Sequence, residues 1–210
     1  EERMDNTKPI MQKGEDGKMV ILKDGDSIVT KIISGMQSGA DISGLQAGEA
    51  LGIPTGGTGT KGHKSEAGTG KKSDNSKIEL KENLELAKRF DIKEGESTNF
   101  RVRTELNVDN SNATIAFRTQ SSPGTDGTIG YSQTGKWSKG NTKEGIYSDG
   151  YRPVLVLNNL NSSKNNIKLI QEFVKKHPGV LNIAGSRESS VPGSTKKIKN
   201  LLVVALSPIK

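Results

Sequence analysis

The chain has 210 residues, of which 25 are glycine, with no cysteine and a formal net charge of +7. This length allows one domain with a full core and is marginal for two. The lack of cysteine excludes disulfides, thiolate metal ligands and a cysteine nucleophile, and is typical of a cytoplasmic protein. No apolar run reaches the ~18 residues that cross a membrane. Aromatic residues, at 4%, are too few for the stacking platforms of single-strand nucleic-acid binders.

The first predicted elements are β-rich. Residues 1–18 are polar and are expected to form a tail. Residues 19–22 (MVIL) and 27–33 (SIVTKII) flank an Asp-Gly turn, which is the pattern of a β-hairpin.

A helix and a long loop are predicted next. Residues 40–52 have helical spacing, with Gly44 and Gly48 small enough to bring the helix close to a sheet, and the inward positions are Ile42, Leu45 and Leu51. Residues 53–76 are rich in Gly, Thr and Lys and predict a loop that cannot pack a core.

The rest of the chain alternates between helices and buried strands. Helices are predicted at 77–90, with Leu80, Leu84 and Ala87 in register, at 162–177, with Ser163 as N-cap, and at 194–207. Strands are predicted at 113–118, 152–159 and 180–185, and residues 120–150 are expected to be mostly loop with a short helix at 127–133. This alternation predicts an α/β fold, a Rossmann-like parallel sheet flanked by helices. We expect a single domain at 28–210, with 1–27 as an N-terminal extension of tail and hairpin strand.

Polar clusters follow the predicted strands, at the sheet edge where ligands of such folds bind. Residues 32–41 (IISGMQSGAD) place glycines at a helix start, where backbone N–H groups favour phosphate. Residues 54–66 (PTGGTGTKGHKSE) offer backbone donors but lack the Gly-Lys-Ser/Thr ending of a P-loop. Residues 121–131 and 182–193 put glycines and hydroxyls directly after strands. Each cluster taken singly is equally compatible with an ordinary turn or loop.

Arg101 and Arg103 are a further candidate for binding a phosphate group. The two arginines are expected to face one side, since they lie two residues apart, and guanidinium groups match phosphate geometry. Glu105 and Asp109 could balance them, and the alternative is an ordinary surface ion-pair group. The clusters together predict a phosphate-binding or ligand-binding site made of Ser34, Gly35, Gln37, Ser38, Gly39, Asp41, Gly56, Gly57, Thr58, Lys61, Arg103, Thr104, Asn107, Gly124, Thr125, Gly127, Thr128, Arg187 and Glu188.

No metal site is predicted. The two histidines, His63 and His177, are far apart and no cysteine accompanies them, which makes a poor ligand set. His63 is expected to be an exposed loop residue.

The clusters SGMQSGAD, GIPTGGTGTKGHKSE, RTELNVDNSNAT, SPGTDGT and NIAGSRES, in this order from Ile32 onward, resemble the putative molybdenum carrier family. That family is similar to the LOG-like, formerly lysine decarboxylase-like, group of Rossmann-like proteins. The resemblance implies a site for molybdenum cofactor, an anionic pterin with a phosphate, or for a nucleotide derivative.

This chain departs from the family pattern at three places. Met36 stands where relatives have a second glycine, and we expect its side chain near the ligand. Asn110 and Asn112 replace two aspartates, which weakens a metal or acid–base role there. Tyr131 stands where LOG enzymes carry the glutamate of N-glycosidic cleavage, which counts against that catalysis.

Three functions remain open. The first is a binding protein for a phosphate-bearing nucleotide-like ligand. The second is a LOG-like phosphoribohydrolase that cleaves the N-glycosidic bond, with Asp126, Glu105, Asp41 or Glu188 as carboxylate. The third is a protein that sequesters a nucleotide signal or assembles as a homo-oligomer. The charge favours an anionic partner, and a small phosphorylated ligand fits better than nucleic acid, although scattered lysines also suit a solvated surface.

Overall fold

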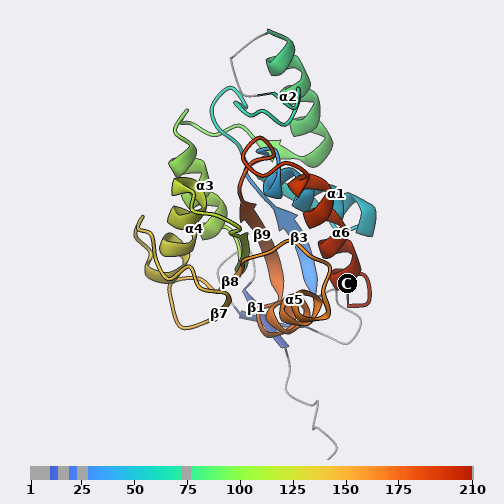
Figure 1. Cartoon of the computed structure of the whole chain (residues 1–210), viewed down its shortest axis with the longest axis vertical. Coiled ribbons are helices and arrows are strands. Elements are labelled where there is room, and N and C mark those ends of the chain that lie inside the picture. Colours follow the sequence, from blue (N-terminus) through green and yellow to red (C-terminus); the bar gives the residue numbers. More distant parts are fainter. Residues whose placement is uncertain (1–9, 14–18, 23–27, 72–76, 210) are drawn as a thin grey trace, which may run out of the picture.

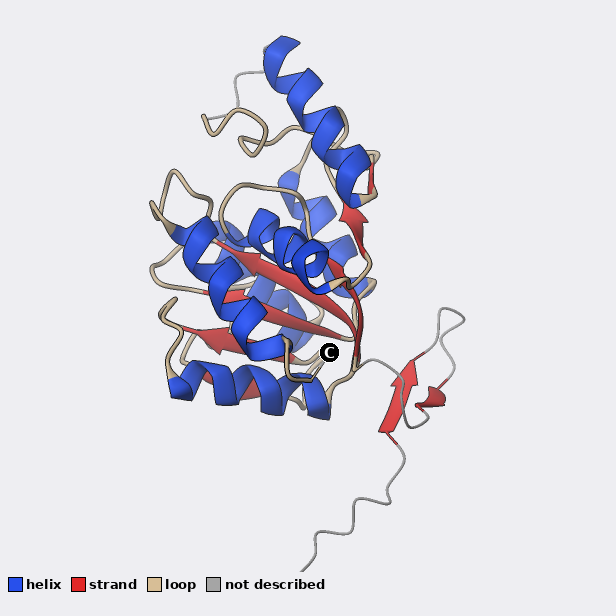
Figure 2. Cartoon of the chain, turned by 90° about the vertical axis from the view of Figure 1, so that its right-hand side faces the viewer, coloured by secondary structure: helices blue, strands red, loops and turns tan. Residues whose placement is uncertain are grey.

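The computed structural model describes residues 10–13, 19–22, 28–71 and 77–209. Its main body is a seven-stranded sheet with helices on both faces (Figures 1 and 2). The strand order is β5-β4-β3-β9-β6-β8-β7, and all neighbours are parallel except the edge pair β7 and β8. The strands are β3 (Val29–Ile33), β4 (Thr55–Thr58), β5 (Ile92–Lys93), β6 (Ala113–Phe117), β7 (Gly145–Tyr147), β8 (Val154–Leu157) and β9 (Gly179–Gly185). The predicted Rossmann-like α/β fold is therefore confirmed.

Two helical layers enclose this sheet. Helices α1, α5 and α6 pack together on one face, and α3 and α4 pack on the other. The helices are α1 (Ala40–Leu51), α2 (Lys77–Phe90), α3 (Phe100–Asp109), α4 (Pro123–Thr134), α5 (Lys164–Lys176) and α6 (Ser194–Leu206). The largest apolar cluster lies between the sheet and the α1, α5 and α6 layer, and contains Ile32, Phe173, Ile183 and Leu202.

The position of β9 determines where a ligand can bind. This strand is the last in the chain, yet it lies in the middle of the sheet between β3 and β6. The chain leaves β3 through α1 toward one edge of the sheet and leaves β6 through α4 toward the other. A crevice forms at the carboxyl ends of strands where the strand order reverses in this way.

Close contact between α1 and the sheet depends on glycine, as the sequence predicts. A Cβ on Gly44 would lie 2.7 Å from Ile183 Cβ, and a Cβ on Gly48 would lie 2.6 Å from Thr55 Cγ2. The predicted inward residues of this helix are all buried. The Ser163 N-cap of α5 is also confirmed, because its hydroxyl accepts a hydrogen bond from Asn166 N at 3.1 Å.

The strands that form the N-terminal hairpin were predicted wrongly. Residues 19–22 form β2, but this strand pairs antiparallel with β1 (Ile10–Lys13), inside the stretch expected to be a tail. The hairpin between 19–22 and 27–33 does not form, because β3 pairs in parallel with β4 and β9 instead. An Asp-Gly pair signals a turn but does not choose the partner strand.

The expectation that 53–76 is loop throughout was also wrong. Residues 55–58 form β4, a strand of the main sheet. Its sequence, TGGT, has no apolar residue, so no hydrophobic pattern marks it. The pairing with β3 and β5 supplies the stabilisation, since backbone hydrogen bonds do not depend on side chains.

Helix α2 packs inward on a face offset from its leucines: of the three residues at helical spacing, Ala87 is buried and the two leucines are not. Leu80 and Leu84 are 44% and 49% exposed, whereas Asn83 and Phe90 are buried. Asn83 Nδ2 donates to the carbonyl oxygens of His63 and Ser65, at 2.8 and 2.9 Å. The helix therefore packs on the backbone of the Gly-rich segment, whose polar groups need a polar helix face.

Candidate functional site

A cavity of about 470 Å³ opens at the carboxyl ends of β9 and its neighbours, between α1, α3 and the start of α4. Its lining comes from segments that are far apart in the sequence. The lining residues are Gly35, Gln37, Asp41, Phe100, Arg101, Arg103, Thr104, Asn107, Ser122, Pro123, Gly124, Thr125, Thr128, Trp137, Asn182, Ile183, Ala184, Gly185, Ser186, Arg187 and Ser190.

Arg103 and Asp41 form a buried ion pair in the cavity wall. Arg103 Nη1 lies 3.3 Å from Asp41 Oδ2, and both side chains are about nine-tenths buried. Burial raises the pKa of Asp41, although the Arg103 charge and a hydrogen bond from Gln37 N oppose the rise. Burial likewise lowers the pKa of Arg103. Gly35 leaves room for the pair, because a Cβ there would lie 1.6 Å from Arg103 Nη1 in its present position.

Several residues that line the cavity carry a buried polar atom without a hydrogen-bond partner in the part of the chain that the structure describes. Among the described residues, six buried side-chain nitrogen or oxygen atoms lack a hydrogen bond, and four of them belong to cavity-lining residues. The four atoms are Gln37 Nε2, Arg103 Nε, Thr125 Oγ1 and Ser186 Oγ. Unpaired buried polar groups are rare in folded proteins. Their concentration among the residues of one cavity makes it the candidate site for a polar molecule.

The first turn of α4 contributes a further group of donors. Pro123 occupies the first turn of the helix, and the N-cap Ser122 makes no side-chain cap hydrogen bond. Gly124 and Thr125 follow in the cavity wall. A helix N-terminus presents free N–H groups and a partial positive charge, both of which favour an anion.

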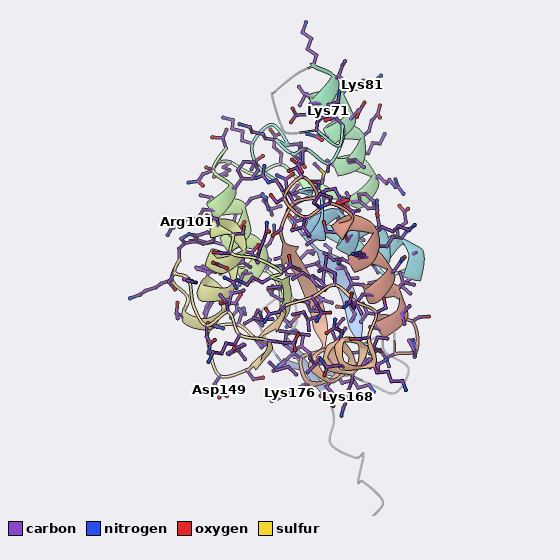
Figure 3. All side chains as sticks on the ribbon, in the orientation of Figure 1. Lys71, Lys81, Arg101, Asp149, Lys168 and Lys176 are labelled. Atoms are coloured by element: carbon purple, nitrogen blue, oxygen red, sulfur yellow. The ribbon has the colours of Figure 1, made fainter. Side chains whose placement is uncertain are left out.

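The cavity lining includes two aromatic rings. Arg101 lies on the exposed side of α3 (Figure 3), and its guanidinium is 5.3 Å from the centre of the Trp137 ring. Trp137 packs on Gly127, where a Cβ would lie 2.1 Å from the indole. Phe100 lines the same wall, 5.1 Å from the Arg103 guanidinium. These rings contribute aromatic surface to the cavity lining.

The region from Asn99 to Asp109 was not predicted to be helical. It forms α3, capped by Asn99 Oδ1, which accepts from Arg101 N at 2.9 Å. Residues two apart on a helix point in different directions, so Arg103 is buried while Arg101 is exposed, yet both line the cavity. Glu105 balances Arg101 at 3.0 Å, as anticipated. Asp109 instead accepts hydrogen bonds from the hydroxyls of Tyr131 and Tyr151.

The structure brings about half of the predicted site residues to the cavity. Those that line it are Gly35, Gln37, Asp41, Arg103, Thr104, Asn107, Gly124, Thr125, Thr128 and Arg187. Those outside the lining are Ser34, Ser38, Gly39, Gly56, Gly57, Thr58, Lys61, Gly127 and Glu188. Phe100, Trp137 and Ser186 were missed as site residues. Ser186 lies within a cluster the sequence had singled out, whereas nothing in the sequence pattern marks the two aromatic residues.

The Gly-rich segment 59–71 contributes no residue to the cavity lining and supports it from behind. Glu66 is 1% exposed, receives a hydrogen bond from Ser38 Oγ, and accepts from the Ser189 amide and hydroxyl at 3.1 and 3.0 Å. Burial alone would raise the pKa of Glu66, but these hydrogen bonds outweigh it and lower the pKa. Arg187 Nη1 lies 4.0 Å from the same carboxylate. Glu66 thus ties the loops after β3 and β9 together.

Asn107 links α3 to the strand that precedes this segment. Its amide accepts from Thr58 N at 2.8 Å and donates to Thr58 O at 2.9 Å. The side chain completes the hydrogen bonding of β4 at the cavity wall. Thr58 therefore contributes to the site through Asn107 rather than by lining the cavity.

Two expectations about single side chains were wrong. Met36 does not approach the ligand space: its side chain is buried in a cluster with Leu45 and Phe90. Its φ of +64° explains the glycine that relatives carry there, because that conformation favours glycine. His63 is buried rather than exposed, since α2 covers the segment that carries it.

Most of the predicted catalytic carboxylates have structural partners outside the cavity. Asp126 pairs with Arg118 at 2.9 Å. Glu188 caps α6, accepting from Gly193 N at 3.0 Å and Ser194 Oγ at 2.9 Å. Tyr131, at the position of the LOG glutamate, lies outside the cavity lining as well. Asp41 is the acidic residue of the lining.

Two further observations concern the described part of the chain. It contains no group of three or more His, Cys, Asp or Glu side chains placed to hold a metal ion. None of its helices is long and apolar enough to span a membrane.

Comparisons with known proteins agree with this arrangement. Residues 32–206 match the model of the circularly permutated YpsA SLOG family. A crystal structure from Syntrophus aciditrophicus SB, described as a putative molybdenum carrier protein, is similar over 87% of this chain and 98% of its own, with 26% identity and a TM-score of 0.63. No curated protein matches the chain.

The topology is consistent with a permuted domain. In a Rossmann fold the first strand lies at the centre of the sheet, and here the last strand, β9, occupies that place. The predicted resemblance to the putative molybdenum carrier and LOG-like group is confirmed by both comparisons. The chain belongs to the circularly permutated YpsA SLOG family.

Proposed function

We propose that the protein binds a phosphate-bearing, nucleotide-like small molecule in this cavity and holds it without turnover. The observation that carries the proposal is the set of unpartnered groups at Gln37, Arg103, Thr125 and Ser186. Gln37 Nε2 and Arg103 Nε can only donate hydrogen bonds, and the two hydroxyls can donate as well. Each buried group left unpaired costs about 1–3 kcal/mol. A ligand rich in acceptor oxygens, such as a phosphate, would satisfy all four.

The charge of the lining supports an anion. Arg101, Arg103 and Arg187 face the cavity against the single lining carboxylate of Asp41, and the N-terminus of α4 adds a partial positive charge. The volume of about 470 Å³ falls within the range of small-molecule sites.

The aromatic residues Phe100 and Trp137 support a planar ring beside the phosphate. A nucleotide derivative has both parts. So does the molybdenum cofactor, which the description of the Syntrophus protein as a molybdenum carrier suggests. Both ligands are therefore candidates for the same cavity.

The test is native mass spectrometry with a panel of nucleoside monophosphates, nucleotide sugars, dinucleotides and pterin phosphates, read at zero time and after overnight incubation. We expect an intact ligand at both times. Thr125→Val should weaken the affinity for that ligand about five- to tenfold, the value of one hydrogen bond of about 1 kcal/mol. Because Thr125 Oγ1 has no protein partner, the melting temperature should not fall.

The control variant is Arg89→Ala. Arg89 forms an exposed ion pair with Glu49 outside the cavity, so its removal should leave ligand affinity unchanged. If no compound of the panel binds, or if Thr125→Val binds as tightly as the wild type, the proposal loses its support.

Hydrolysis of the N-glycosidic bond is the second candidate function, and Asp41 is the observation that favours it. Asp41 is a buried carboxyl group in the cavity wall, and burial raises its pKa. A carboxylate beside the ribose could stabilise an oxocarbenium-like transition state. Free base accumulating overnight with the wild type, but not with Asp41→Asn, would establish an enzyme. A ligand that stays intact but leaves very slowly would instead favour sequestration of a nucleotide signal.

A further inference from the structure

The side-chain amide of Gln37 is held in one orientation. Its Oε1 accepts from two backbone amides, Ser38 N and Glu66 N, each at 3.0 Å. The reversed orientation would place the NH₂ group against these two N–H donors, and donors repel each other. Nε2 must therefore be the free end of the amide. Gln37 is 7% exposed and lines the cavity.

The two donors that fix Gln37 are themselves anchored. Glu66 and Ser38 are joined by their side chains, and Glu66 is also held by Ser189, which lies in the loop after β9. Ser65 Oγ donates to Met36 O at 2.6 Å, which fixes the backbone just before Gln37. The amide thus cannot reverse without breaking contacts among three separate loops.

Gln37 also lies at the same end of the cavity as the buried ion pair. Its backbone N–H donates to Asp41 Oδ2 at 3.2 Å, the oxygen that Arg103 Nη1 contacts. The unpartnered Nε of Arg103 belongs to the same guanidinium. Gln37 and Arg103, which each carry an unpartnered donor atom, therefore share one contact at Asp41.

We infer that Gln37 determines ligand specificity by presenting a fixed hydrogen-bond donor, so that the group reaching it must be an acceptor oxygen and cannot be an amine. The inference rests on the proposed binding function and names the chemistry at one end of that ligand. The acceptor is either a phosphoryl oxygen or a ring carbonyl, which both carry lone pairs and no proton at neutral pH.

The experiment replaces one atom. Gln37→Glu keeps an oxygen for the amides of Ser38 and Glu66, changes the free NH₂ group to oxygen and adds a negative charge. Because that charge is buried near Asp41, the melting temperature should fall at pH 7 and recover toward the wild-type value at about pH 5, where the new carboxyl group takes up a proton. The Gln37→Met variant removes the acceptor from both amides and should melt several degrees lower. This contrast separates the recognition role of Nε2 from the structural role of Oε1.

Binding is then measured by calorimetry across the nucleotide panel, with inosine and adenosine monophosphates as a matched pair that differs by oxygen or amine at one ring position. If the ring meets Gln37, the wild type should favour inosine monophosphate about tenfold, and Gln37→Glu should reverse the preference. If a phosphoryl oxygen contacts Gln37, Gln37→Glu should lower the affinity for both compounds by tenfold or more. The variant loses a hydrogen-bond donor, and its carboxylate repels the phosphate. Either pattern supports the inference.

Equal affinities of Gln37→Glu and the wild type for every compound that binds would overturn the inference while leaving the proposed function standing. A wild-type protein that binds no phosphorylated compound would overturn the proposed function, and the inference with it.

Discussion

Replacing Arg103 with methionine should cost the protein about 3 kcal/mol of stability at pH 7. Arg103 Nη1 and Asp41 Oδ2 are 3.3 Å apart, a separation that corresponds to about 5 kcal/mol of attraction at an effective dielectric constant near 20. Burial of both groups offsets much of that attraction in the wild type. Removal of the arginine alone leaves the Asp41 carboxylate buried without a counter-charge, which typically costs about 3–5 kcal/mol.

The measurement is urea unfolding of Arg103→Met, Asp41→Asn and the double variant. The double variant leaves no isolated charge, so it should recover most of the loss, with an interaction energy of about 2 kcal/mol or more. Arg89→Met, which breaks the exposed pair with Glu49, is the matched control and should lose at most about 1 kcal/mol. An interaction energy below about 0.5 kcal/mol for the Arg103 pair would refute the argument that burial makes it strong.

The stability lost by Arg103→Met should also depend on pH in a defined direction. Burial raises the pKa of Asp41 above its ordinary value of 3.8, and removal of Arg103 raises the pKa further. A carboxyl group with a raised folded-state pKa favours folding when protonated. The stability that such a group contributes is fully present below its pKa in the unfolded chain. It is lost as the pH rises through its pKa in the folded protein. The gap between Arg103→Met and the wild type should therefore narrow as the pH falls from 7 toward 4.

Three further predictions concern packing and capping. Gly44→Val should destabilise the protein by about 1–3 kcal/mol, because the valine side chain would overlap Ile183. Thermal unfolding checks this, and an unchanged melting temperature would refute the close packing of α1 on the sheet. Leu84→Asp should change the free energy of unfolding by about 0.5 kcal/mol or less, because this leucine is exposed. Ala87→Asp on the buried face should cost several times more. The reverse order of the two losses in urea unfolding would contradict the orientation of α2. Ser163→Ala should cost about 1 kcal/mol by the same assay, because it removes the N-cap of α5, and no loss would mean that the cap contributes nothing.

Helix α2 shows how far a periodic pattern can mislead. Leu80, Leu84 and Ala87 predict a helix correctly, because the spacing reflects the helical repeat itself. The spacing does not settle which side packs inward: Ala87 is buried but the two leucines are exposed, because the buried side depends on the neighbouring segment. That neighbour is a loop rich in exposed backbone groups, and Asn83 satisfies them.

The residues of the cavity were predictable only in part, because a local pattern marks a turn but not its place in the fold. Glycines and hydroxyls after a strand mark a strand-to-helix turn, and the turns after β3, β6 and β9 do meet at the cavity. The Gly-rich segment has the same composition but follows β4, one strand farther from the centre of the sheet. Composition could not distinguish a loop that lines the cavity from one that supports it.

The sequence alone determined the local structure of the strongly patterned regions. The apolar stripes of α1, α5 and α6 and the continuous apolar runs of β6, β8 and β9 specify their elements, because burial of a periodic apolar face stabilises one secondary structure over another. Only the tertiary structure decided which strands pair, where the unpatterned strand β4 lies, and which donors remain free. The free amide of Gln37 depends on two backbone N–H groups, one of them 29 residues away in the chain, and no local pattern encodes a contact of that kind.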